Sequence, residues 1–338
     1  MTSSNVEGTQ FLQNNEQITK ITQPILSQFD RLIQSYVLFN LLFIIAGLLE
    51  ILSMLLFFTF LTQSSLVAFA LSLIFLTMFS YFIFRVYFQT AKPEQLDHLK
   101  NQFMSNFKTI LDYREGEPEH HIAIAFCCSK LSDQLAGKEF SYYRPHRWLG
   151  LFSSMLEKFS YWWHWQDVLL MRELLLKASI TEHVKLVRSE PTNLEFHAVL
   201  ANAYVLLSSL YASQKKRLEK EEDQWIYFKN YSAALDLKFR ITAQKAVEEL
   251  KILNEFAPND PWVHLQLAYS YHDLNMPLEE INEYEIILKF NPDDLDALYK
   301  LGLLYFQEGM NAKGLRIYET LKHKHYKKAE SLLKLYGA

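Results

Sequence analysis

Two long apolar runs near the start of the chain dominate its hydrophobic pattern. The first, residues 36–61, contains Glu50 as its one charged side chain, and the second, residues 66–88, contains one basic residue near its end. Each run exceeds the about 20 residues that a helix needs to cross the hydrocarbon layer of a bilayer. Only the uncharged segment 62–65 separates them. The pattern therefore predicts two antiparallel transmembrane helices, a hairpin over residues 36–88.

The charges that flank the two runs predict their orientation. Basic residues precede the first run and follow the second, and the connector has none; they are Lys20, Arg31, Arg85, Lys92 and Lys100. The positive-inside rule therefore places both termini of a two-span membrane protein in the cytoplasm. About 35 mostly polar residues precede the first run, unlike a cleaved signal peptide. A hairpin buried in a soluble core is the alternative, and the lack of a polar stripe argues against it.

Residues 1–35 are predicted to be a polar N-terminal segment that ends in an amphipathic helix. Apolar residues recur at helical spacing within 24–35: Ile25, Leu26, Phe29, Leu32 and Ile33. Because this face adjoins the first apolar run, we expect the helix to lie on the membrane surface before the chain enters the bilayer.

Glu50 is the acidic residue in the predicted spans, and an unpaired carboxylate is costly at mid-bilayer. Ala46, Glu50 and Ser53 share one face of the first helix, and we expect them to pack against the second helix, including Ser72 and Thr77. A hydrogen bond at Glu50 would hold the hairpin together or join two copies of the chain by self-association. A proton or ion site is the sharper alternative, but two helices enclose such a site poorly.

Composition indicates an all-α chain. The 338 residues include only 9 glycines and 9 prolines, too few for the turns of an all-β fold, and half of the residues are hydrophobic, which excludes a disordered chain. The net charge of −4 provides no overall basic field, so we expect no nucleic-acid partner. The sequence lacks phosphate-binding glycine loops, nucleophile elbows and zinc-protease motifs. We therefore predict a non-enzymatic protein without cofactor or metal.

Residues 92–175 are predicted to form amphipathic helices, with divergent repeats as one interpretation. Pro118 is expected to open one helix and Gly137 to end it. The aromatic residues that crowd 139–165 favour a helix-packing core over contact with the bilayer interface. Cys127 and its neighbours His120, His121 and Cys128 are spaced unusually for zinc, which favours core positions.

Residues 176–338 contain an internal repeat. Three stretches share a proline, any residue, Asn or Asp, and then Leu-Ala or Leu-Gly and Tyr at fixed offsets. The frames begin at Pro191, Pro258 and Pro292, with intervals of 67 and 34 residues. The predicted helix N-caps are Asn193, Asp260 and Asp294. A period of this length predicts stacked helix pairs, an α-solenoid.

This frame is similar to that of the tetratricopeptide repeat family, a unit of about 34 residues with a helix-turn-helix fold. The resemblance covers 176–338 and is best at 258–322. It implies an α-solenoid whose first helices line a partner-binding groove. Because the interval 212–230 exceeds one unit, we expect one elongated helix pair, and 327–336 is expected to be a terminal capping helix.

Some positions depart from the family's pattern. His264 and Leu298 stand where the family often has Trp, and Glu280 and Gly314 stand where Ala or Ser is usual. The groove residues that the resemblance implies are Trp262, Leu265, Tyr269, His272, Asp273, Asp296, Tyr299, Phe306 and Gln307. Leucine and tyrosine replace the Lys and Asn of the family's carboxylate clamp, so an aromatic groove for an apolar or helical protein segment is expected. Packing of these aromatic residues against the next repeat is the alternative.

Charge is segregated in this region. Acidic residues dominate 259–296 and basic residues dominate 313–334; we interpret the basic end as the solvated face of a cap rather than a contact with anionic lipid or nucleic acid.

Together the features predict a membrane-anchored scaffold or adaptor with two partners, the lipid bilayer and a protein in the groove. A membrane-inserted effector or membrane-shaping hairpin protein is the alternative. A subunit of an enzyme complex is a third.

Overall fold

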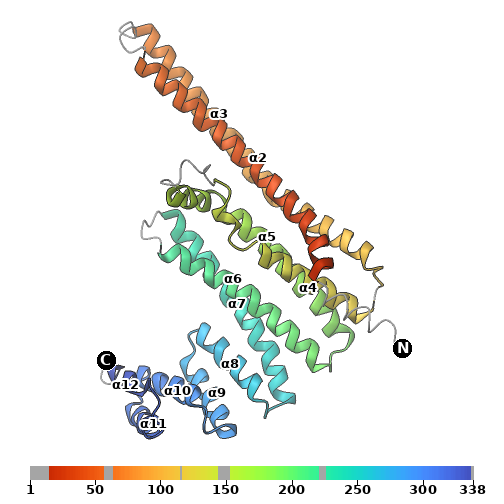
Figure 1. Ribbon diagram of the computed structural model, residues 1–338, viewed down its shortest axis with the longest axis vertical. Helices are drawn as coiled ribbons and strands as arrows, with labels where there is room; N and C mark the ends of the chain where they lie inside the picture. Colours follow the sequence, from red (N-terminus) through yellow and green to blue (C-terminus); the bar gives the residue numbers. More distant parts are fainter. Residues whose placement is uncertain (1–14, 57–63, 115, 144–152, 221–225, 336–338) are drawn as a thin grey trace. The chain divides into compact units, whose positions relative to one another are not determined.

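The computed structural model describes residues 15–56, 64–114, 116–143, 153–220 and 226–335 (Figure 1). These residues form helices and no strand, so the chain is all-α, as its scarcity of turn residues predicts. Its internal contacts divide it into two compact units, residues 1–182 and 183–338. The helix α5 (Ser153–Ser189) contains this division.

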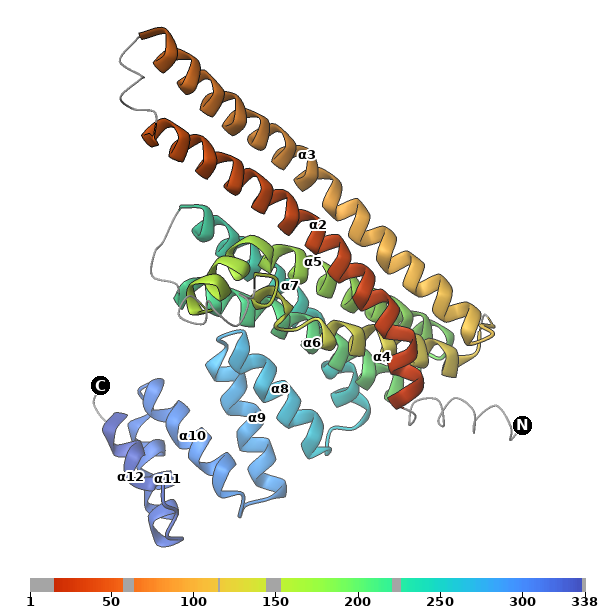
Figure 2. The same ribbon diagram turned by 45° about the horizontal axis from the view of Figure 1, so that its top comes forward.

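The N-terminal unit is built on two long helices, α2 (Asn15–Leu56) and α3 (Ser64–Ile110). Figure 2 shows them side by side and antiparallel. Each continues through a proline, Pro24 in α2 and Pro93 in α3. The ends of the predicted spans at 36 and 88 therefore fall inside continuous helices, and both helices extend well past the apolar runs.

The predicted amphipathic helix over 24–35 exists as part of α2, but its expected position on a membrane surface is wrong. Its apolar face belongs to a buried core with α3, α4 (Pro118–Gln134) and α5. The core residues that α2 and α3 contribute are Ile25, Leu26, Phe29, Ile33, Leu96, Leu99, Phe103 and Phe107. Apolar residues of the protein itself cover this face and remove it from solvent, which leaves no apolar surface there for lipid.

The predicted limits of α4 are confirmed. Pro118 occupies the first turn after the N-cap Glu117, where its missing N–H costs nothing, and the helix ends before Gly137. Gly137 has a φ of 83°, a left-handed conformation that glycine adopts without strain, and it precedes the short helix η1 (Lys138–Phe140). Cys127 and Cys128 are buried in the core, as expected.

The C-terminal unit contains successive helix pairs. The helices are α6 (Leu194–Lys220), α7 (Ile226–Phe256), α8 (Pro261–Asp273), α9 (Pro277–Phe290), α10 (Leu295–Gln307), α11 (Asn311–His323), α12 (Ala329–Leu332) and η3 (Leu333–Leu335). Helix α6 packs on α7, α8 on α9, and α10 on α11. The first of these pairs is elongated, as the sequence interval predicts. Helix α12 buries Leu332 against the last pair, as a capping helix should.

The three predicted N-caps are confirmed. Asn193 Oδ1 accepts a hydrogen bond from the N–H of Glu195 at 3.1 Å, and Asp260 Oδ1 accepts one from the N–H of Trp262 at 2.9 Å. Asp294 Oδ1 accepts from two backbone N–H groups, at 3.1 and 3.0 Å. These side chains satisfy amides that have no partner within the first helical turn, so they fix where α6, α8 and α10 begin.

Candidate functional site

The apolar parts of α2 and α3 meet along a narrow seam. Many of the residues with reduced exposure recur at spacings of three, four or seven; they include Tyr36, Asn40, Phe43, Gly47, Glu50 and Met54 on α2, and Val67, Ala70, Ile74, Thr77, Tyr81 and Phe88 on α3. This heptad-like spacing is typical of two helices that pack along their whole length. Aromatic rings fill the seam at its end near residues 36 and 88; Phe39 stacks on Tyr81 there, with ring centroids 5.7 Å apart.

One polar contact joins the middle of the seam. Thr77 Oγ1 donates a hydrogen bond to Glu50 Oε1 at 2.6 Å. Ser53 and Ser72 instead donate to backbone carbonyls of their own helices. Of the predicted packing residues, the structure therefore brings Glu50 and Thr77 together, places Ala46 beside the seam, and leaves both serine hydroxyls out of it.

The outward faces of both helices are apolar. Between Leu38 and Tyr87 the exposed residues are mainly Leu, Ile, Phe and Met, such as Leu48 with 61% of its surface exposed. Soluble monomers rarely expose apolar patches larger than a few hundred Å². Three helical stretches are long and apolar enough to cross a membrane, Thr19–Leu56, Ser65–Ile110 and Leu194–Glu219. Half of the most apolar window of the third is buried within the protein, whereas the other two windows are almost fully exposed.

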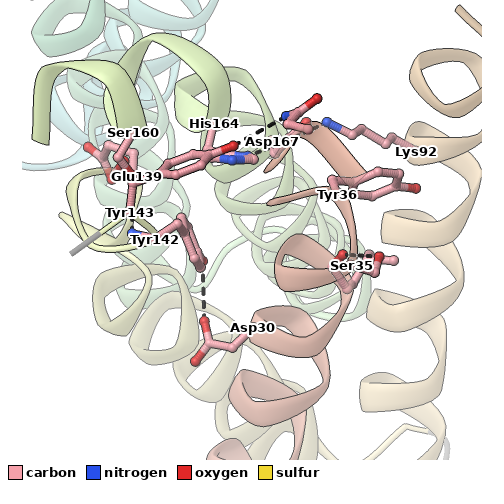
Figure 3. A network of polar contacts seen from close by, with 12 residues as sticks. Asp30, Ser35, Tyr36, Lys92, Glu139, Tyr142, Tyr143, Ser160, His164 and Asp167 are labelled. Atoms are coloured by element: carbon pink, nitrogen blue, oxygen red, sulfur yellow. Dashed lines mark hydrogen bonds and ion pairs between the residues drawn. The ribbon is translucent and has the colours of Figure 1, made fainter. Parts of the chain in front are cut away.

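A polar layer lies where the apolar seam ends (Figure 3). Lys92 Nζ, on α3, contacts Asp167 Oδ2, on α5, at 2.8 Å, and His164 Nδ1 lies 3.2 Å from the same oxygen. The ammonium group of Lys92 also lies 4.4 Å from the centre of the Tyr36 ring. Burial lowers the pKa of His164. These contacts join α2 and α3 to α5. Burial strengthens the electrostatic attraction between their charged groups.

A second set of contacts in Figure 3 attaches α2 to the segment before α5. Asp30 accepts hydrogen bonds from Tyr142 Oη at 3.2 Å and from Lys138 Nζ at 2.5 Å. Ser160 Oγ donates to the carbonyl of Glu139 at 2.7 Å. Burial, reinforced by the Asp30 charge, raises the pKa of Tyr142 well above its usual value, so this hydroxyl stays a donor. This polar layer could not be predicted from local sequence, because Asp30 lies 108 and 112 residues from its two partners and Lys92 lies 75 residues from Asp167.

Buried histidines recur in the C-terminal unit with the same two partners. His264 Nδ1 lies 2.6 Å from Glu283 Oε2, and His264 Nε2 lies 2.9 Å from the carbonyl oxygen of Pro258. His197 makes the same contacts to Glu249 and to the Pro191 carbonyl, at 2.6 and 2.9 Å. Both ring nitrogens of each histidine therefore face an oxygen that can accept a hydrogen bond.

The charge balance at His197 agrees with that geometry. Burial alone would lower the pKa of His197, but the hydrogen bonds to Glu249 and to the Pro191 carbonyl, together with the glutamate charge, outweigh burial and raise it. Each of these histidines follows the frame proline by six residues, and its glutamate precedes the next frame proline by nine. The contact therefore joins the two helices of a pair at one register.

The same contact reveals an earlier helix pair in that register. His121 Nδ1, on α4, lies 2.5 Å from Glu182 Oε2, on α5, and Glu182 precedes Pro191 by nine residues. Helices α4 and α5 thus pair through the positions that α6–α7 and α8–α9 use. In the α10–α11 pair the corresponding residues are Leu298 and Ile317, which lie in one apolar cluster. An apolar contact replaces the ion pair there.

A second position recurs eight residues after each histidine position. Ser129 Oγ lies 3.2 Å from Ser179 Oγ in the α4–α5 pair, and His272 Nδ1 lies 3.1 Å from Glu280 Oε2 in the α8–α9 pair. In the α10–α11 pair the corresponding residues are Phe306 and Gly314. A Cβ added to Gly314 would lie only 2.8 Å from the Phe306 ring. The missing side chain of Gly314 therefore provides the space that this ring fills.

Phe306 consequently differs from its predicted role. It is buried in the C-terminal core and presents no surface to a partner. The remaining predicted groove residues, which we call the first-helix surface, are Trp262, Leu265, Tyr269, His272, Asp273, Asp296, Tyr299 and Gln307 on α8 and α10. Trp262 and Tyr269 are exposed, whereas Leu265 is partly buried against the core.

Polar contacts fix several side chains of the first-helix surface. Lys300 Nζ lies 4.5 Å from the centre of the Tyr269 ring and so joins α10 to α8. Tyr299 Oη lies 2.8 Å from Ser331 Oγ, and Asp296 Oδ1 accepts a hydrogen bond from Tyr326 Oη at 2.5 Å. His272, Asp273 and Gln307 are exposed. The surface can offer a partner aromatic faces and a few polar groups held in place by their neighbours.

Nothing in the described ranges gathers three or more side chains that could hold a metal ion. Burial raises the pKa of the Cys127 thiol to about 12 and that of Cys128 further, so both thiols stay protonated and unreactive at neutral pH. Comparison of the chain with protein-family models gives no match, and comparison with curated protein sequences gives none either.

Proposed function

We propose that this protein is a membrane-anchored helical scaffold. Residues 36–88 cross the bilayer as a two-span hairpin with both termini in the cytoplasm, and the C-terminal unit is a tetratricopeptide-like solenoid that binds a protein partner on its first-helix surface. One observation carries the proposal: nearly all outward side chains along 38–87 are apolar and exposed. Water makes such a continuous surface costly unless a bilayer covers it. On α8 the exposed rings of Trp262 and Tyr269 are the groups proposed to contact the partner.

The helix-pair geometry supports the scaffold part of the proposal. Contacts at a fixed register recur from α4–α5 to α10–α11, as in quasi-one-dimensional repeat proteins, where each pair supports its neighbours. Such stacks use rigid helices to present side chains, and Tyr269 is held in this way by Lys300. Rigid aromatic anchors bind at low entropic cost.

Anchoring would make the surface effective at modest affinity. A partner that is also associated with the membrane meets the surface at a raised effective concentration, without any new contact. Self-association through the hairpin belongs to the same proposal, because Glu50 Oε2 is buried and has no hydrogen-bond partner among the described residues. A polar group of a second copy would meet this carboxylate in the plane of the membrane, once the Glu50 side chain turns out of the seam.

Site-specific photo-crosslinking tests the partner surface. Benzoylphenylalanine is placed at Tyr269 or at Trp262 of the full chain in membranes from its own source, and the adducts are identified by mass spectrometry. Leu237 and Ile241, exposed apolar residues of α7, are the matched control positions. We expect a discrete protein adduct at the α8 positions and none at the α7 positions. Equal adducts at all four positions, or none at Tyr269 and Trp262, would reject the first-helix surface.

A further inference from the structure

We propose that the beginning of α5 is a membrane-interface element whose exposed face contacts the lipid headgroup layer. This inference rests on the proposed placement of residues 36–88 in a bilayer. It concerns Met155, Phe159, Trp162 and Trp163, which lie far from both predicted spans in the sequence. The partner is a lipid surface, and no protein is needed to cover this face.

Contacts place the beginning of α5 beside the apolar helices, inside their ends. The guanidinium carbon of Arg85 lies 4.3 Å from the centre of the Trp163 ring. Asn40 Nδ2 donates a hydrogen bond to Tyr143 Oη at 3.3 Å, and the ring of Tyr143 packs against that of Phe159 with centroids 5.0 Å apart. Residues 143 and 159–163 therefore lie level with Asn40 and Arg85.

The depth of this level follows from helix geometry. Asn40 and Arg85 lie four and three residues inside the ends of the apolar segment 36–88. At about 1.5 Å of rise per residue, that is about 5 to 6 Å from its boundary. Amphipathic interfacial helices bury their apolar face to about 5–10 Å, in the region between headgroups and acyl chains. One turn further along α5, the contact between Lys92 and Asp167 lies on the aqueous side of the boundary.

The side chains at this level suit an interface. Trp162 is 49% exposed and meets Trp163 edge to face, with ring centroids 4.8 Å apart, and Met155 is 67% exposed. On an adjoining side of the helix, Tyr161 and Trp165 are buried. This part of α5 thus has apolar residues toward both the core and the outside, which a helix facing water avoids. Tryptophan, with an apolar body and one N–H, is enriched at this depth.

The surroundings favour lipid over a protein partner. Exposed apolar residues flank Arg85 on α3, including Phe84 and Tyr87. The cation of Arg85 stacks on Trp163 near the headgroups, where a charged group can keep contact with water and phosphate. Glu157 and Lys158 are both exposed and balance each other, so a zwitterionic bilayer is sufficient.

The test measures the depth of single residues in a bilayer. Cys127 and Cys128 are buried with raised thiol pKa values, so the native chain contributes little to labelling. The full chain is prepared as Trp162→Cys, Met155→Cys, Leu48→Cys and Thr181→Cys variants and labelled with bimane. Each is reconstituted in phosphatidylcholine vesicles with a nitroxide near the top or near the end of the acyl chain. Leu48 is the deep reference, about 18 Å inside residue 36, and Thr181 is the exposed aqueous reference.

We expect the label at position 162 to lose fluorescence mainly with the shallow nitroxide, and the label at position 48 mainly with the deep one. The label at 155 is a second probe, in case the cysteine at 162 disturbs packing on Trp163. It lies about 10 Å further along α5, so its quenching by the deep nitroxide should be stronger than at 162. If the label at position 48 is quenched but the labels at 155 and 162 behave like the label at 181, the proposed interface element is wrong, whereas the proposed membrane span is supported. If 48 is not quenched, the bilayer placement itself is wrong.

Discussion

The apolar half of the α2–α3 pair and the helix pairs of the C-terminal unit distribute polarity in opposite ways. Along α2 and α3 the exposed residues are Leu, Ile and Phe, and the seam between the helices contains the polar pair Glu50 and Thr77. In the C-terminal unit the cores are Leu, Ala and Tyr, and charged residues lie mostly outside. Both regions still place a glutamate between two helices.

The two glutamates have different partners, and the proposed placement of residues 36–88 in a bilayer accounts for the difference. Glu50 accepts from a neutral hydroxyl, whereas Glu283 pairs with a histidine whose two nitrogens both face acceptors. Lipid provides no hydrophobic force between helices, so packing and single hydrogen bonds hold such a pair together at modest energies. In water, apolar burial drives pairing, and a buried ion pair fixes the register at a desolvation cost. Four sets of variants test this distinction.

Breaking one ion pair should have the largest effect. Glu283→Ala removes one partner of a buried pair and leaves His264 Nδ1 without its carboxylate, which should cost about 3–5 kcal/mol. The double variant His264→Leu with Glu283→Ile copies the residues that the α10–α11 pair already has, and it should recover most of that loss. Hydrogen exchange of the α8 and α9 amides in the full chain measures both. A double variant as unstable as the single one would show that the pair itself, and not the unpaired group left behind, determines the stability of these helices.

Matched leucine truncations separate burial in water from exposure to lipid. Leu267 on α8 is 1% exposed, so Leu267→Ala should cost about 2–5 kcal/mol through lost burial and a residual cavity. Leu48→Ala removes the same atoms from an outward face of α2 and should leave the stability of the helix pair nearly unchanged, because the lipid tails refill the space. Thermal unfolding of each variant in phospholipid bicelles measures the two effects. Comparable losses would mean that Leu48 faces protein.

Two glycines sharpen the comparison further. Gly314→Ala forces a Cβ against the Phe306 ring, 2.8 Å away, and should cost about 1–3 kcal/mol by overpacking. Phe306→Leu in the same chain should relieve most of that cost. Gly47 lies in the α2–α3 seam with nothing within 4 Å of an added Cβ, so Gly47→Ala should be neutral or slightly stabilising. Unfolding midpoints of the native chain and of the three variants measure these effects. A Gly314→Ala variant with an unchanged midpoint would contradict the packing of Phe306.

Helix boundaries and N-caps could be predicted from local chemistry. Asp260 and Pro261 specify the start of α8 through one side-chain acceptor and one fixed φ, and no distant residue is involved. What covers an apolar face could not be predicted in this way. The face with Ile25 and Phe29 has the periodicity that a membrane-surface helix would have, and only the fold shows Phe103 and Phe107 against it.

The surface residues show the same limit. The spacing of Phe306 in the repeat matches a groove position. Its ring is nevertheless buried, because Gly314 has no side chain and leaves room for it. The α4–α5 pair escaped the repeat frame because no proline stands six residues before His121, as Pro191 and Pro258 do before His197 and His264. Glu182, nine residues before Pro191, was the one sequence signal that could have revealed it.

The smallest expected effect belongs to the polar contact between α2 and α3 in the proposed membrane-spanning segment. Thr77→Val keeps the side-chain shape and removes the hydrogen bond to Glu50, which should weaken the α2–α3 association by about 0.6 kcal/mol, a typical value for such bonds in membranes. Ser72→Ala is the matched control, because the Ser72 hydroxyl donates to the Ala68 carbonyl of its own helix and joins nothing across the seam. Titration with sodium dodecyl sulfate, read by energy transfer between labels on α2 and α3, should shift for Thr77→Val and not for Ser72→Ala. If the two variants behave alike, Glu50 is held by something other than Thr77, and a second copy of the chain becomes the group to test.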